Sequence, residues 1–233
     1  MRMMNILLNK TDFDQDWASP YLMDLFRQED RVCVLPLSLD EGWASDHEDW
    51  QDRFQSGSEY REDINRPLLN YGIRLDRITY CDHFVDSKES VLKKIQEASI
   101  LVLLADNARE AMLRLEELPA VMDAILRFHG IVITLAEANH LFLDEFYDST
   151  YGEYYVGLGV LPGIAFMMDY NERLEELRET IFAIESLGKR VVLLPQQSGM
   201  LFDGEHYELF GNSRVVDEED LDELYLRYQF EQE

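Results

Sequence analysis

The residues with the clearest chemical meaning follow the apolar run at 130–135, in the turn Thr134-Leu135-Ala136-Glu137-Ala138. A sharp turn from a strand into a helix is where many hydrolases present a nucleophile, because the helix N-terminus stabilises negative charge there. The central position of this turn is Ala136, whose methyl group cannot attack a substrate. We therefore interpret the turn as the place of a nucleophile without the nucleophile.

Carboxylates follow three of the apolar runs. Asp106 follows the run at 100–104, Glu137 belongs to the turn at Ala136, and Asp169 follows the run at 164–168. Because ligands gather at the carboxyl ends of parallel strands, these side chains are candidates for a shared site. Three carboxylates there could bind Mg²⁺, Mn²⁺ or Ca²⁺, or a cationic group such as an amine or a basic peptide end. For each residue taken alone, we favour helix capping or a first-turn position.

Short apolar runs alternate with longer amphipathic stretches along the chain, which predicts a mostly parallel, doubly wound sheet in one domain of residues 1–233. A hairpin is expected around Asp203-Gly204, and an acidic helical tail over 216–233. The predicted strands are 3–8, 31–37, 76–80, 100–104, 130–135, 154–158, 164–168 and 190–194. The predicted helices are 14–27, two within 42–71, 87–98, 108–128 with a break at Pro119, 137–142 and 171–187.

The charge of the chain limits its partners. There are 47 acidic and 21 basic residues, and the net charge is −26. Such a field repels nucleic-acid phosphates and anionic membranes, so neither is an expected partner. No apolar run reaches the roughly 18 residues that a membrane span needs, and no signal peptide is recognised, which predicts a cytoplasmic protein. A monomer or a homodimer fits equally well.

Several stretches, in their order and spacing, resemble the serine peptidases of the dipeptidase E and cyanophycinase family over roughly residues 6–211. They are Val34-Leu35-Pro36-Leu37-Ser38, the segment 95–102, Phe128-His129-Gly130-Ile131-Val132-Ile133, Gly157-Leu158-Gly159-Val160-Leu161-Pro162 and the hairpin at Asp203-Gly204. The resemblance implies a three-layer α/β sandwich of the class I glutamine amidotransferase-like, flavodoxin-like kind, with a C-terminal β-hairpin.

The same resemblance implies that no catalytic residue is intact. The family's Gly-x-Ser-Ala-Gly turn is Thr134-Leu135-Ala136-Glu137-Ala138 in this chain, and its Gly-Gly-Asn oxyanion loop is Ala105-Asp106-Asn107. The position of the family's histidine base is Asp169, and the nearest match to its acid is Gln196. A carboxylate at Asp106 would also disfavour a developing oxyanion.

Two hypotheses follow. The first is a non-catalytic homologue of these peptidases, which keeps a pocket for a small molecule or a peptide and needs no cofactor. The second is a hydrolase of the same family with rearranged catalytic residues, or one assisted by a metal on Asp106, Glu137 and Asp169. Ser38 and Ser198 lie near strand ends but have no obvious histidine partner, and we expect His140 to face the helix surface.

Overall fold

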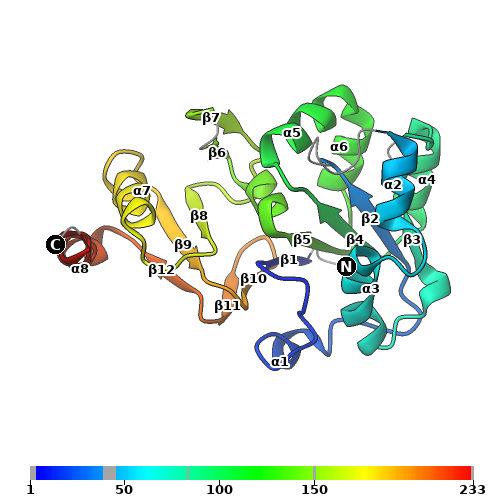
Figure 1. Cartoon of the computed structure of the whole chain (residues 1–233), viewed down its shortest axis with the longest axis horizontal. Helices are drawn as coiled ribbons and strands as arrows, with labels where there is room; N and C mark the ends of the chain where they lie inside the picture. Colours follow the sequence, from blue (N-terminus) through cyan, green and yellow to red (C-terminus); the bar gives the residue numbers. More distant parts are fainter. Residues whose placement is uncertain (1–3, 39–45, 83, 149–150, 232–233) are drawn as a thin grey trace.

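A seven-stranded sheet forms the centre of the protein in a computed structural model that describes residues 4–38, 46–82, 84–148 and 151–231 (Figure 1). Its strand order is β11-β10-β1-β5-β4-β2-β3, with β1 to β5 parallel and the hairpin β10–β11 antiparallel at one edge. The strands are β1 (Met4–Leu8), β2 (Val32–Pro36), β3 (Ile78–Tyr80), β4 (Ile100–Leu104), β5 (Ile131–Leu135), β10 (Ser198–Phe202) and β11 (Tyr207–Gly211).

Helices cover both faces of this sheet, which explains why its central strands are apolar at every position. In β4, Leu101 and Leu103 belong to one buried cluster, whereas Ile100, Val102 and Leu104 belong to another. The cluster of Leu101 and Leu103 packs under α4 (Lys88–Glu97), α5 (Ala108–Glu117) and α6 (Pro119–Leu126). The opposite cluster packs under α1 (Ser19–Leu22), α2 (His47–Phe54) and α3 (Glu59–Asn70). This is the predicted doubly wound α/β sandwich with its C-terminal hairpin.

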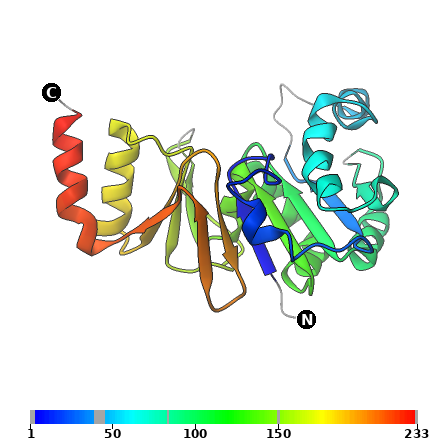
Figure 2. The ribbon, with the colours of Figure 1, turned by 90° about the horizontal axis from the view of Figure 1, so that it is seen from below.

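A smaller, three-stranded sheet lies to one side of the central sheet (Figures 1 and 2). It has the order β12-β9-β8, in which β8 and β9 are parallel. Helices α7 and α8 lie side by side against it and enclose a third apolar cluster. Its elements are β8 (Ile164–Met168), α7 (Leu174–Glu185), β9 (Arg190–Leu194), β12 (Arg214–Val216), the short 3₁₀ turn Glu218–Asp220 and α8 (Leu221–Phe230).

Between the two sheets, the chain forms a 3₁₀ helix and a hairpin. The 3₁₀ helix η2 (Ala136–Phe142) follows β5 directly. The hairpin consists of β6 (Glu145–Asp148) and β7 (Glu153–Val156), and it projects beside the smaller sheet (Figure 1). The strand predicted at 154–158 is therefore one half of a hairpin, whose partner strand β6 was not predicted.

Three predicted elements are shorter than expected. The acidic tail predicted as helical over 216–233 forms an α-helix only in α8, because Val216 belongs to β12, which pairs with β9. The helix predicted over 14–27 is only α1, because Pro20 lacks a backbone N–H and is tolerated only in the first helical turn. The strand predicted over 76–80 begins with a 3₁₀ turn, Leu75–Arg77, and leaves only β3 in the sheet. The helices within 42–71 and the break at Pro119 are confirmed. None of the helices in the described ranges is long and apolar enough to cross a membrane.

Candidate functional site

The turn at Ala136 has the backbone geometry of a nucleophile-bearing turn. Ala136 joins β5 to η2, is exposed, and has a φ of 50°, in the left-handed region that residues other than glycine rarely adopt. A buried network holds the turn: Thr134 Oγ1 donates to Asn139 Oδ1 at 2.5 Å, and Asn139 Nδ2 donates to the Leu8 carbonyl at 3.0 Å. The position predicted for the nucleophile is therefore the strained, exposed point of the turn, and it carries a methyl group.

The loop that the resemblance assigns to oxyanion binding is occupied by a side chain of the protein. The backbone N–H groups of Asp106 and Asn107 both donate to Ser38 Oγ at 3.1 Å, and this hydroxyl donates to the Asn107 carbonyl at 2.8 Å. Ser38 is buried. Asn107, and not Asp106, caps α5, because its side chain accepts from the Glu110 N–H at 2.9 Å. Ser38 therefore orders this loop through its hydroxyl group.

The second serine considered as a nucleophile is also engaged. Ser198 is fully buried, and its Oγ donates to the Pro195 carbonyl at 2.5 Å. Gln196, the match to the family's acid, lies exposed in the turn between β9 and β10. Its neighbour Gln197 has a φ of 58°, so the backbone of Gln197 is also in the left-handed region.

Asp169 directly follows β8 of the smaller sheet and, like Ala136 and Gln197, has a positive φ, of 49°. Asn9 Nδ2 lies 3.1 Å from Asp169 Oδ1, 3.1 Å from the Leu194 carbonyl and 2.9 Å from the Pro195 carbonyl. Lys10 Nζ lies 3.2 Å from Asp169 Oδ1. The buried amide of Asn9 thus links β1 of the central sheet to the ends of β8 and β9, and Asp169 serves as one of its acceptors.

Glu137 and His140 form an ion pair within η2. Residues three apart in a 3₁₀ helix lie one above the other, and Glu137 Oε2 lies 3.2 Å from His140 Nδ1. The His140 side chain is only 14% exposed and lies near Phe146 and Phe166. The expectation that His140 faces the helix surface was wrong, since it assumed the 3.6-residue turn of an α-helix.

Each member of the pair favours the charged form of the other. Burial alone would lower the pKa of His140, but the hydrogen bond and negative charge of Glu137 outweigh it and raise the pKa above its ordinary value. Burial alone would raise the pKa of Glu137, and Asp169 adds to that effect, yet His140 lowers the pKa below its usual range.

Glu137 and Asp169 interact electrostatically, but the predicted metal site is not formed. Within the described ranges, no group of three or more His, Cys, Asp or Glu side chains is arranged to hold a metal ion. Asp106, Glu137 and Asp169 therefore do not converge as a set of ligands.

Beside the turn at Ala136 is a pocket of about 520 Å³ between η2, the hairpin β6–β7, β8 and α7. This volume is in the range of small-molecule sites. Glu137 and His140 line it, and so does the buried Lys189, whose Nζ lies 3.1 Å from Asp144 Oδ1 and 3.0 Å from Glu145 Oε1. The aromatic residues lining it are Phe146, Tyr147, Tyr154, Phe166 and Phe182.

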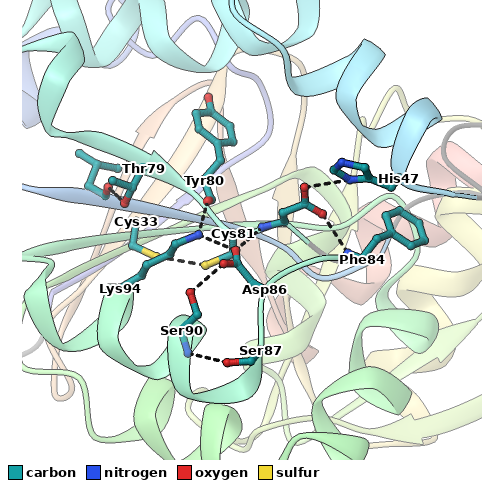
Figure 3. Close-up of polar contacts among 12 residues, drawn as sticks. Cys33, His47, Thr79, Tyr80, Cys81, Phe84, Asp86, Ser87, Ser90 and Lys94 are labelled. Carbon is teal, nitrogen blue, oxygen red and sulfur yellow. Dashed lines mark hydrogen bonds and ion pairs between the residues drawn. The ribbon is translucent and has the colours of Figure 1, made fainter.

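A separate polar cluster follows β3 at the far edge of the central sheet (Figure 3). Lys94 Nζ lies 2.5 Å from Asp86 Oδ2 and 3.0 Å from the Tyr80 carbonyl, which fixes the loop that precedes α4. In the same view, the buried thiols of Cys33 and Cys81 are 3.6 Å apart. These groups serve the packing of the edge strand and lie apart from the pocket.

Three parts of the site were not predicted from the sequence: Asn9 with Lys10, the Ser38 hydroxyl as an acceptor, and the tyrosines of the hairpin. The sequence does point to Asn9 as a site residue, because it directly follows the first predicted strand, as the other candidate residues follow theirs. The role of Ser38 depends on two backbone N–H groups that lie 68 and 69 residues away, which no local pattern reveals.

A comparison with protein-family models and with curated proteins finds no match. Solved structures do match. One is a candidate peptidase E protein from Listeria monocytogenes EGD-e, with a TM-score of 0.63 and 12% identity, over 90% of this chain and 98% of that one. Another is a peptidase from an acI-B1 Actinobacterium, with a TM-score of 0.58 and 6% identity, over 93% of this chain and 95% of that one. At such identities, the likeness shows a shared peptidase E-like fold.

Proposed function

We propose that this protein is a non-catalytic homologue of the serine peptidases whose fold it shares, and that it binds a small molecule or a peptide in the pocket beside Ala136. The observation that carries the proposal is the exposed methyl group of Ala136 at the left-handed point of the turn after β5. A nucleophile here would need a side-chain oxygen or sulfur, and alanine has neither.

Three further observations support the loss of hydrolysis. Ser38 occupies the N–H groups of Asp106 and Asn107, which would otherwise be available to an oxyanion. Asp169 stands at the position that the resemblance assigns to the base, where it accepts from Asn9. His140, the histidine nearest in sequence to Ala136, lies in η2, at a position that the resemblance does not assign to the base. In other triad enzymes, losing such a unit lowers turnover by about 10⁶.

The pocket supports the binding half of the proposal. It lies along β8 and beside η2, next to the turn at Ala136, and it combines aromatic walls with charged groups. Pockets with mostly apolar linings and a few polar groups are typical of small-molecule sites.

A fluorophosphonate probe tests the loss of the nucleophile. We expect no labelled serine in the folded protein and none in the Ala136→Ser variant, because a restored hydroxyl would still lack its base. Stoichiometric labelling of one serine in the unmodified protein, removed by Ser38→Ala or Ser198→Ala, would overturn the proposal.

A panel of free dipeptides tests binding and hydrolysis together. We expect every dipeptide to remain intact by mass spectrometry, and at least one to raise the melting temperature of the protein. At a concentration of about 100 Kd, binding adds about 2.7 kcal/mol, which corresponds to roughly 5–10 °C for a chain of this length. Catalytic release of amino acids by the pure protein would contradict the proposal.

A further inference from the structure

One wall of the pocket presents aromatic rings to solvent. Tyr147 of β6 and Tyr154 of β7 face each other across the hairpin, with ring centroids 5.1 Å apart, and each side chain is 43% exposed. Phe182 of α7 lines the same pocket and is 47% exposed. We call Tyr147 and Tyr154 the tyrosine wall. Aromatic faces left open in a concave site provide area for a ligand.

Most charged groups around the pocket already have partners within the protein. Lys189 is paired with Asp144 and Glu145, and His140 with Glu137. The Arg173 side chain donates to Glu176. These pairs leave little net charge for a ligand to recognise at those positions.

Glu179 of α7 differs from the other pocket carboxylates. It is half-buried, and within the described part of the chain no Lys, Arg or His forms an ion pair with it within 4.0 Å. Burial raises its pKa, although the nearby positive charge of Arg178 opposes this. The pKa of Tyr154 is also raised by burial and by the charges of Glu145 and Glu179, so both carboxylates lie near this tyrosine.

We infer that the tyrosine wall and Glu179 bind an organic cation, an alkylammonium group on a small apolar body. The inference rests on the proposed function, since it names the ligand class of the same pocket. A cation is attracted to the faces of aromatic rings, and Glu179 supplies the opposite charge. The apolar body of such a molecule fits against Phe182. The net charge of −26 favours the approach of cations over anions.

Arg178 is not the cation that pairs with Glu179. Its exposed side chain lines the pocket, but it forms no ion pair with Glu179 among the described contacts. Arg109, in contrast, lies over the rings of Tyr151 and Tyr155, at 4.3 Å and 5.2 Å from their centroids. Two other tyrosines of the hairpin segment thus already contact a cationic side chain of the protein.

The test compares choline with 3,3-dimethyl-1-butanol, which has the same shape and no charge. Both are titrated into the full chain by calorimetry or by chemical-shift changes of the tyrosine ring protons. We expect choline to bind, and the neutral isostere to bind at least about fivefold more weakly. Glu179→Gln should weaken choline binding about tenfold, as expected for a lost contact to a charged group.

Two further variants keep the test specific. Glu175→Gln removes one negative charge from α7 outside the pocket, and we expect it to change choline affinity by less than twofold. Tyr154→Leu keeps apolar area but removes a ring face, and it should weaken choline more than the neutral isostere. Circular dichroism and melting temperature establish that each variant folds.

The outcomes separate this inference from the proposed function. Equal binding of choline and its neutral isostere, or unchanged choline affinity in Glu179→Gln, would overturn cation recognition. Cation recognition would also be overturned if a dipeptide bound while neither choline nor arginine amide, a second organic cation, bound at millimolar concentration. That result would leave the proposed pocket standing. Labelling of a serine by the fluorophosphonate would overturn the proposed function independently of these titrations.

Discussion

The Glu137–His140 pair makes the stability of the turn at Ala136 depend on pH. The perturbation that tests this is Glu137→Gln, which keeps the shape of the side chain and removes its charge. A hydrogen bond to a charged group contributes about 1.5–3 kcal/mol when buried. The Glu137 side chain is 45% exposed, so solvent weakens the interaction, and we expect a loss of about 1–2 kcal/mol.

The direction of the pH effect follows from the two pKa shifts. The raised pKa of His140 stabilises the folded protein fully below about pH 6.5, the ordinary value, and this contribution is lost as pH rises through the raised value. The lowered pKa of Glu137 stabilises the fold above about pH 4.3 and loses its effect as pH falls through the lowered value. The contribution of the pair is therefore largest between about pH 4.3 and pH 6.5.

Urea unfolding at pH 5.5 and at pH 8.5 measures this contribution. We expect Glu137→Gln to lower the free energy of unfolding by about 1–2 kcal/mol at pH 5.5 and by clearly less at pH 8.5. Glu175→Gln, an exposed residue of α7, is the matched control for removing one negative charge, and its effect should be small at both pH values. If Glu137→Gln has no effect on the free energy of unfolding at pH 5.5, or the same effect at pH 5.5 and pH 8.5, the pair does not make the pH-dependent contribution described above.

Two other predictions concern buried groups. Asn9→Ala removes an amide whose two protons are shared by three acceptors, and we expect the free energy of unfolding in urea to fall by about 1.5–3 kcal/mol. An unchanged urea midpoint would contradict the role of Asn9 in linking the two sheets. Contact with the Cys81 sulfur and burial raise the pKa of Cys33, and both thiols are buried. Ellman's reagent should therefore react much more slowly with the folded protein than with the urea-unfolded chain, and equal rates would show that the edge strand opens readily.

The sequence predicts elements well where burial alone determines the pattern. The strands at 100–104, 164–168 and 190–194 have the predicted bounds, because each coincides with a short, largely apolar run of the sequence. The pattern does not say which strands become neighbours, and β8 and β9 pair with each other outside the central sheet. The orientation of His140 could not be predicted either, since it depends on η2 being a 3₁₀ helix.

Three residues that follow strands near the proposed site have a strained backbone. Ala136, Asp169 and Gln197 all have positive φ, a conformation that costs an L-residue roughly 1–2 kcal/mol. Strained positions persist when the surrounding structure holds them, and here the buried amides of Asn139 and Asn9 do so at two of the three. Hydrogen bonds from buried amides therefore maintain the backbone shape at these two positions. Backbone likeness to peptidases at 12% and 6% identity is compatible with a lost reaction. Ligand binding in the adjoining pocket is a use for this region that needs its shape and does not need a nucleophile.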